Sequence, residues 1–289
     1  HGTSRGLGDV YKRQVYGQGT WNHSNTLRSV FGLRYTDDEV YSEVTNFFGR
    51  QGTDILQVDG SKVTSRFVIE KDIDENRMFY VSYTKGYKPG GSNLTYGRED
   101  IVAPIVVLPT FEEEVVDAYE FGLKADLAGG RTRINSAVFF YNYEGLQYQA
   151  TDPELFQGGV SNIPESEIYG AEVELSTYLT DSMILDANLS WIETEITADH
   201  FALDNVQSDI ATNALLAQGV NQFSDQVQIA RAAEITNVKG NELAKTPNFT
   251  ANLALTWEGY VENWGELTNS LQYIYSCLLY TSPSPRDVP

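Results

Sequence analysis

The sequence predicts an all-β protein, built as an antiparallel up-and-down meander of about ten strands. Two observations predict it: apolar and polar residues alternate strictly in one segment after another, and the connections between segments alternate between short and long. The composition agrees, because the 289-residue chain holds 18 Tyr, 13 Phe and 24 Gly yet has a mean hydropathy of −0.33. This balance fits strands whose two faces differ, as in a soluble sandwich or a membrane barrel.

The alternation is clearest at 118–127. Tyr119 and Phe121 fall on one face of this segment, and Glu120 and Lys124 fall on the other. A helix would group its apolar residues three and four apart, so a strict two-residue period indicates a strand. The same pattern recurs at 169–178, 184–192 and 249–257. We expect the polar faces, which include Glu172 and Glu174, to line the interior of a barrel.

The connections sort by length. We expect strands at 15–23, 27–37, 63–71, 77–87, 116–127, 131–145, 167–178, 183–196, 247–257 and 265–275. The short connections lie at 23–26, 72–76, 128–130, 179–182 and 258–264, and the long ones at 38–62, 88–115, 146–166 and 197–246. Alternate connections of a meander lie at the same end, so one end carries tight turns and the other long loops. That asymmetry is typical of an outer-membrane barrel, and a soluble sandwich has no reason for it.

Two finer features follow from the pattern. In the long connection 197–246, Ile210 and Ala214 have helical spacing and Asp204 can cap a helix start, so we expect a short helix over 204–219. Near the short turns lie four large aromatic residues, Trp21, Trp257, Tyr260 and Trp264. We expect them to form an interfacial aromatic girdle, and the alternative is that they are ordinary core aromatics.

The residue pattern at the two ends of the chain differs from that of the segments between them. Ser4–Gln14 and Cys277–Arg286 can be encoded by opposite strands of one DNA segment, which resembles the adapter inserted by a transposase into sequencing libraries. We therefore expect residues 1–14 and 277–289 to be adapter-derived, and residues 15–276 to be native.

This division changes the composition of the native part. It removes the sole cysteine, so no disulfide framework is expected. The two ends carry four basic and two acidic residues, so 16 of the 20 basic and 38 of the 40 acidic residues remain. Such acidity argues against a nucleic-acid partner.

No pattern in the sequence indicates catalysis, so we expect no enzyme and no cofactor. The native histidines, His23 and His200, fall in separate connections and do not predict a metal site. Acidic clusters occur at 37–39 and 111–117. They are either solvated loop charge or carboxylates that bind divalent cations next to lipopolysaccharide phosphates.

Several segments, taken in order, resemble successive barrel hairpins of TonB-dependent outer-membrane receptors. These segments are 15–39, 78–93, 118–149, 166–191 and 240–257. The order and spacing carry the resemblance, since each motif alone is only an alternating strand. One departure lies around the glycine pair of 78–93, where this chain has Pro89 and Ser92.

The resemblance implies a 22-stranded transmembrane barrel, closed by an N-terminal plug, in the outer membrane of a Gram-negative bacterium. Such receptors take up scarce solutes such as iron–siderophore complexes, energised by TonB–ExbB–ExbD, and lie among lipid and lipopolysaccharide. The sequence shows neither plug nor TonB box, so we expect 15–276 to be a partial barrel. With both edges open, we expect the isolated chain to aggregate rather than transport.

Ligand contacts in this family come from the outer loops. The candidates here, chosen for position and chemistry, are Tyr87, Arg98, Gln147, Tyr148 and Phe156. Two other classes remain open at this point. One is a passive outer-membrane channel or adhesin barrel, and the other is a soluble all-β binding domain.

Overall fold

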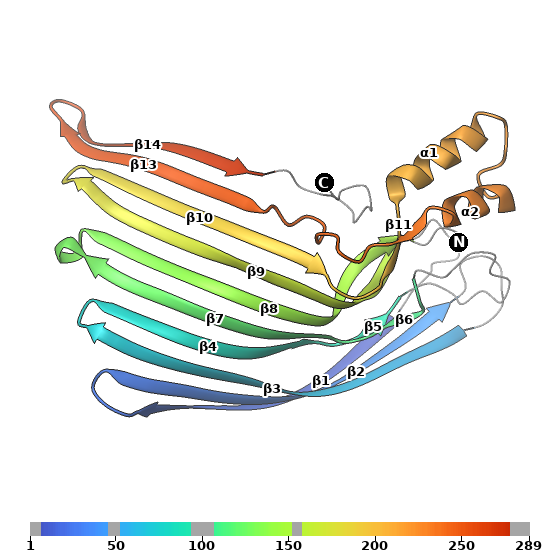
Figure 1. Ribbon diagram of the computed structural model, residues 1–289, viewed down its shortest axis with the longest axis horizontal. Helices are drawn as coiled ribbons and strands as arrows, with labels where there is room; N and C mark the ends of the chain where they lie inside the picture. Colours follow the sequence, from blue (N-terminus) through green and yellow to red (C-terminus); the bar gives the residue numbers. More distant parts are fainter. Residues whose placement is uncertain (1–6, 46–52, 94–106, 152–157, 278–289) are drawn as a thin grey trace.

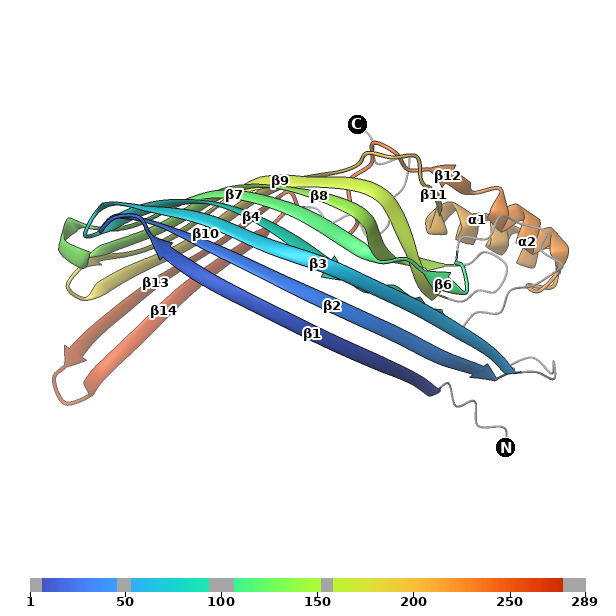
Figure 2. The same ribbon diagram turned by 90° about the horizontal axis from the view of Figure 1, so that it is seen from below.

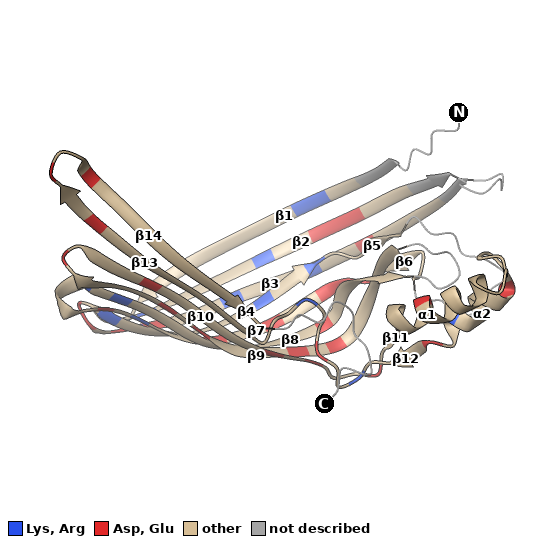
Figure 3. Cartoon of the chain, turned by 90° about the horizontal axis from the view of Figure 1, so that it is seen from above, with Lys and Arg blue, Asp and Glu red and all other residues tan. Residues whose placement is uncertain are grey.

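The computed structural model describes residues 7–45, 53–93, 107–151 and 158–277. Within these ranges, one ten-stranded antiparallel sheet dominates, in the order β1-β2-β3-β4-β7-β8-β9-β10-β13-β14. Strands of this sheet that pair in space follow one another in the meander (Figure 1). The sheet curves into an open trough whose two rims are β1 and β14 (Figures 2 and 3). The expected all-β meander is confirmed.

The strands of the large sheet are β1 (Leu7–Asn22), β2 (Leu27–Thr45), β3 (Thr53–Asp74), β4 (Arg77–Lys88), β7 (Glu114–Leu127), β8 (Thr132–Thr151), β9 (Gly158–Thr180), β10 (Met183–Ile196), β13 (Phe249–Val261) and β14 (Gly265–Ser276). Short strands pair as β5 (Gly91–Ser92) with β6 (Thr110–Phe111), and β11 (Phe201–Leu203) with β12 (Ile235–Asn237). The helices of the described part are α1 (Asn205–Leu216), α2 (Asp225–Ala232) and a 3-10 turn at Ala128–Gly130. None of the helices in the described part is both long and apolar enough to cross a membrane.

The short turns lie together at one end of the sheet, which we call the turn end (Figure 1). Their own residues hold them. The Ser24 hydroxyl accepts a bond from the Leu27 amide at 3.1 Å, and the Asp74 carboxylate accepts one from the Asn76 amide at 3.0 Å. Gly129 and Gly130 have φ angles of 68° and 88°, which glycine adopts without strain.

The opposite end, which we call the loop end, carries the long connections and both helices (Figure 1). Here the strands run further than the sequence predicts. β2 and β3 occupy much of the predicted loop 38–62, where Asp38 pairs with Gly60 and Glu39 with Asp59. Similarly, β8 and β9 occupy much of 146–166. The buried face of the β2 extension carries the polar residues Thr36, Asp38 and Ser42, so the apolar–polar alternation stops before the strand does.

The two faces of the sheet differ as expected. On the face that we call apolar, large side chains are exposed across consecutive strands: Phe31, Phe67, Val81, Tyr119, Phe121, Val138, Tyr169, Leu189, Leu253 and Tyr273. The register places them side by side rather than scattered. A continuous exposed apolar belt of this kind is the surface that a barrel turns to lipid. The opposite, polar face carries Glu120, Lys124, Glu172 and Glu174.

Three of the four predicted turn-end aromatic residues are strongly exposed, with Trp21 at 72%, Tyr260 at 76% and Trp264 at 81%, whereas Trp257 is half-buried. Such exposure fits a girdle and is the opposite of a core role. In the described residues, the main cluster of buried apolar residues lies instead at the loop end, where Ile163 and Ile196 pack against residues of the 197–246 connection.

Helix α1 is present where it was predicted, and Asp204 caps it by accepting a bond from the Gln207 amide at 3.1 Å. Its buried face is not the apolar one. Ile210 is 57% exposed, whereas Ser208 and Thr212 are buried. The small polar side chains allow α2 to approach closely, and this packing decided the orientation.

Candidate functional site

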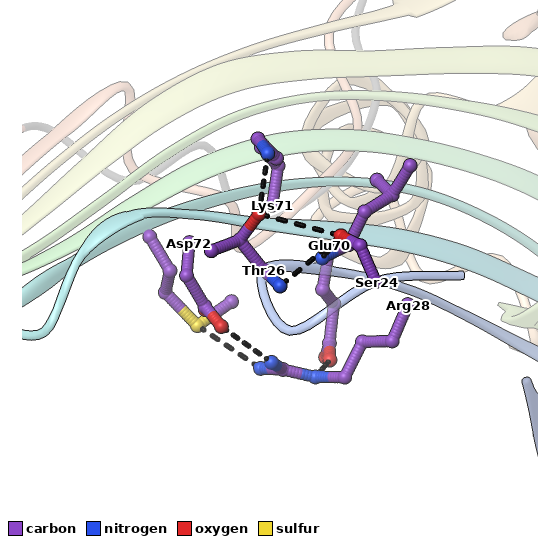
Figure 4. A network of polar contacts seen from close by, with 8 residues as sticks. Ser24, Thr26, Arg28, Glu70, Lys71 and Asp72 are labelled. Atoms are coloured by element: carbon purple, nitrogen blue, oxygen red, sulfur yellow. Dashed lines mark hydrogen bonds and ion pairs between the residues drawn. The ribbon is translucent and has the colours of Figure 1, made fainter. Parts of the chain in front are cut away.

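The polar face begins, near the turn end, with a charged network (Figure 4). The Arg28 guanidinium of β2 donates to Glu70 and, at 3.0 Å, to Asp72 on β3. Lys71, between these two acids, lies on the other side of the strand and donates to Thr26 at 2.6 Å (Figure 4). Alternation thus places the cation and its two carboxylates on one face, where they neutralise each other.

Midway along the polar face, the Tyr80 ring lies flat over Gly122 of the next strand. A side chain at Gly122 could not fit, because its Cβ would lie 2.3 Å from the ring. The Tyr80 hydroxyl donates to Glu120, and the Lys124 ammonium lies 5.7 Å from the ring centroid. The Tyr80 side chain therefore fills the space over Gly122 at this point of the wall.

A concavity of about 430 Å³ lies further toward the loop end, between β1, β2, β3 and β4. The paired residues of β3 and β4 end at Arg66 and Thr84, so the two strands separate there. Lysines and arginines gather around it, visible as blue segments on β1, β2 and β3 (Figure 3). The cations lining it are Lys12, Arg34, Arg66 and Lys85, and Tyr87 lies at its edge.

Tyr87, a predicted ligand contact, is therefore at a cavity, but its hydroxyl is buried. The hydroxyl lies over Gly60, where a Cβ would meet it at 2.6 Å. Gly60 pairs with Asp38, whose side chain is 1% exposed and lies 3.3 Å from the Lys12 ammonium. Tyr87 thus contributes to the floor of the cavity rather than reaching into it.

Gln147, a second predicted contact, holds the connection between β4 and β7 in place. Its side-chain amide donates to the carbonyls of Pro89 at 2.8 Å and Glu112 at 3.0 Å. Its backbone amide donates to the Glu114 carboxylate at 2.7 Å. Its polar groups are therefore used within the protein.

Tyr148 has a similar role toward the 197–246 connection. Its hydroxyl lies 2.8 Å from Nε2 of His200, and the two rings meet edge to face. Burial lowers the pKa of His200 below its ordinary value of 6.5. His200 is thus neutral at physiological pH and suited to this bond. The remaining predicted contacts, Arg98 and Phe156, lie outside the described residues.

Two asparagines that sequence reasoning missed organise the loop end. Asn93, 6% exposed, donates to the carbonyls of Leu108 and Val160 and accepts from the Val160 amide, each at 2.8 Å. Asn162 likewise donates to the carbonyls of Glu112 and Gly145 and accepts from the Glu112 amide. No local pattern marks them, because their partners are far away in the chain.

An acidic groove of about 570 Å³ adjoins Asn162. Its carboxylates are Glu112, Glu113, Glu144 and Glu165. Two of these belong to the predicted acidic cluster 111–117, and Glu113 forms an ion pair with Lys62. Within the described residues, no group of three or more His, Cys, Asp or Glu side chains is placed to hold a metal ion.

A curved antiparallel sheet with one apolar face, one polar face and all long loops at one end defines the wall of a transmembrane β-barrel. The sequence model described as "TonB dependent receptor-like, beta-barrel" matches residues 3–286. The chain belongs to this family of TonB-dependent receptors, and the expected resemblance is confirmed.

The chain is also similar to individual receptors of this family. The chain is 26% identical over 125 residues to a probable TonB-dependent siderophore receptor, PiuA, of Acinetobacter baumannii, covering 43% of this chain and 16% of that protein. Among solved structures, it resembles the ferric yersiniabactin uptake receptor FyuA of Yersinia pestis, with a TM-score of 0.66 and 16% identity over 94% of this chain. It also resembles the siderophore receptor PiuA of A. baumannii, with a TM-score of 0.65 and 18% identity over 93% of this chain. The chain spans 35% and 33% of the lengths of these two structures.

Proposed function

We propose that this chain is part of the barrel wall of an outer-membrane receptor that imports an iron–siderophore complex into a Gram-negative bacterium. In this proposal TonB–ExbB–ExbD supplies the energy, acting through parts of the receptor beyond this chain. The observation that carries it is the match of nearly the whole sheet, turn end and loop end included, to receptors named for siderophore uptake. Family membership supports the energy source.

The apolar face supports the proposed location. The register aligns six aromatic residues in one row across six strands: Phe31, Phe67, Tyr83, Tyr119, Phe140 and Tyr169. Two residues further toward the loop end, the same face continues with Leu33 and Tyr35 on β2, whereas on β4 and β7 it turns polar. Lys85 there forms an ion pair with Asp117 at 3.0 Å, and the Tyr83 hydroxyl donates to Asp117 at 2.6 Å.

An aromatic row followed at once by charge is expected at the boundary between hydrocarbon and headgroups. We therefore assign the part of this row on β4 and β7, where charge follows it, to the outer boundary of the membrane. In the proposed receptor, lipid tails contact the aromatic row, and lipopolysaccharide contacts the polar row above it.

The test is uptake by the full-length receptor that contains this segment. The receptor would be produced in bacteria that lack their own siderophore receptors, and radioactive iron supplied as siderophore complexes would be followed into the cells. We expect accumulation that is lost when the TonB gene is deleted. Uptake that continues without TonB would instead indicate a passive channel, and no uptake of any iron complex would contradict the proposed solute.

A further inference from the structure

Arg34 and Arg66 stand apart from the other arginines. Beyond Leu7–Gln14, the remaining arginines of the described chain are each ion-paired with a carboxylate: Arg28, Arg77, Arg131, Arg133 and Arg231. Among the described residues, neither Arg34 nor Arg66 has such a partner. This is unexpected in a chain with twice as many acidic as basic residues.

The register explains why they lack partners and places them together. Arg34 pairs with Thr64, and Arg66 lies two residues further along the same strand, so the two guanidinium groups are diagonal neighbours on the polar face. Long side chains at such positions can reach each other. Their directly paired neighbours on this face are Tyr16, Thr64, Gly32 and Thr84, and none is acidic.

Both arginines line the concavity of about 430 Å³ where β3 and β4 separate. Of the other two cations, Lys85 belongs to the apolar face, where it pairs with Asp117, and Lys12, which pairs with Asp38, lies in the segment 1–14 that we expect to be adapter-derived. Arg34 is oriented by the Tyr16 ring, which lies 5.7 Å from its guanidinium carbon. Gly32 lies opposite Arg66 and has no side chain of its own, and the Gln18 side chain comes to 3.7 Å from the place where a Cβ would be.

We propose that this concavity binds a carboxylate group of the imported solute, held between Arg34 and Arg66. The guanidinium group presents parallel N–H donors that match a carboxylate, and two adjacent unpaired cations are stabilised by a shared anion. The Thr64 and Thr84 hydroxyls line the same space and add donors. This assignment rests on the proposed receptor function and deepens it, because it makes the solute a carboxylate-bearing iron chelate.

The first experiment measures protection of single arginines in the detergent-solubilised full-length receptor. Phenylglyoxal modifies accessible arginines, and mass spectrometry reports the rate at each position. Metal-free citrate is the probe. We expect citrate to slow modification of Arg34 and Arg66 about tenfold, as a charge-assisted pair of contacts would. Modification of Arg77 and Arg131, which are ion-paired at the turn end, should not change.

Two results would overturn the proposal. Equal reaction rates at Arg34 and Arg66 with and without citrate would show that no carboxylate site exists. Arginines that are unreactive in the intact receptor, but become reactive when its plug is deleted, would show that a plug carboxylate occupies the site instead. Neither result depends on transport, so the proposal and the receptor function can fail separately.

The second experiment tests charge recognition during uptake. The double variant Arg34→Gln/Arg66→Gln should lose uptake of ferric citrate relative to an uncharged ferric trihydroxamate, and Arg34→Lys/Arg66→Lys should restore part of it. The matched control Arg77→Gln/Arg131→Gln removes the same charge at the turn end and should leave this ratio unchanged. An unaltered ratio in the Gln variant of Arg34 and Arg66 would contradict the assignment.

Discussion

At the turn end, short-range bonds such as those of Ser24 and Asp74 close chain reversals, whereas at the loop end the connections are held by side chains from distant strands. Ser24 closes its turn through an amide three residues away, but Asn93 holds Val160, 67 residues further along the chain. The difference teaches that the two ends should respond differently to mutation. A substitution at the turn end has a local effect, and one at the loop end can release a whole connection.

The largest effect is expected at Asn93. Asn93→Ala in the full-length receptor leaves the Val160 amide and two carbonyls without partners, which should cost about 3 kcal/mol. Hydrogen exchange should then become faster throughout 107–111 and 158–162. The control is Asn135→Ala near the turn end, where the side chain makes an exposed bond to Glu174. Equal hydrogen-exchange rates at 107–111 and 158–162 in the two variants would contradict the idea that loop-end side chains hold whole connections.

A smaller and pH-dependent effect is expected at His200. Because burial lowers the pKa of folded His200, the unfolded connection binds the proton more readily. The contribution of His200 to stability should thus be complete above pH 6.5 and be lost as the pH falls from there toward the folded pKa. Hydrogen exchange in 201–203, measured across this range, should accelerate on acidification. His200→Gln should abolish that dependence, and His23→Gln, in a short turn, should leave it intact.

At the turn end, Gly130→Ala should cost about 1 kcal/mol, because alanine is strained at a φ of 88°. The readout is the temperature at which the full-length receptor loses its folded electrophoretic mobility. Gly158→Ala is the matched substitution at a position with ordinary φ and no close contact, where the nearest atom would be 3.8 Å away. An equal drop in this temperature for Gly158→Ala would contradict the assignment of the effect to the turn conformation of Gly130.

The smallest effect is expected for Arg131→Gln. This removes an ion pair with Asp181, whose side chain is 92% exposed, and such pairs contribute about 0.5 kcal/mol or less. The same unfolding measurement should show almost no change in the melting temperature. A loss as large as that of Gly130→Ala would mean that turn-end ion pairs matter more than their exposure suggests.

The same contrast explains what the sequence could predict. Turns and the strands beside them were predictable, because a two-residue period and turn residues are local signals. The extensions of β2 and β3 were not, since the buried positions there, such as Asp38, are polar and interrupt the alternation. Helix α1 was predicted, but the residues that it buries were not: Ile210 is exposed, and Ser208 and Thr212 are buried in the packing at the loop end.

In the candidate site, too, positions set by local sequence were predictable and contacts set by strand pairing were not. Tyr87, Gln147 and Tyr148 lie at the loop end, but Gln147 and Tyr148 use their polar groups in bonds within the wall and the Tyr87 hydroxyl is buried. Arg34 and Arg66 were missed because each, taken alone, is only a charged residue on the polar side of a strand. What distinguishes them is the absence of a nearby carboxylate among the described residues, and that depends on the pairing of three strands.

The separation of β3 from β4 beyond Arg66 and Thr84 has a mechanical consequence. Below that point, the wall is joined by backbone bonds that must break together. Above it, the gap is bridged by individual side chains, including the Lys62–Glu113 ion pair and the hydroxyls of Ser42 and Ser92 at 2.5 Å. Under a pulling force, the wall would therefore open along this seam, one contact at a time, while the ladders on either side remain closed.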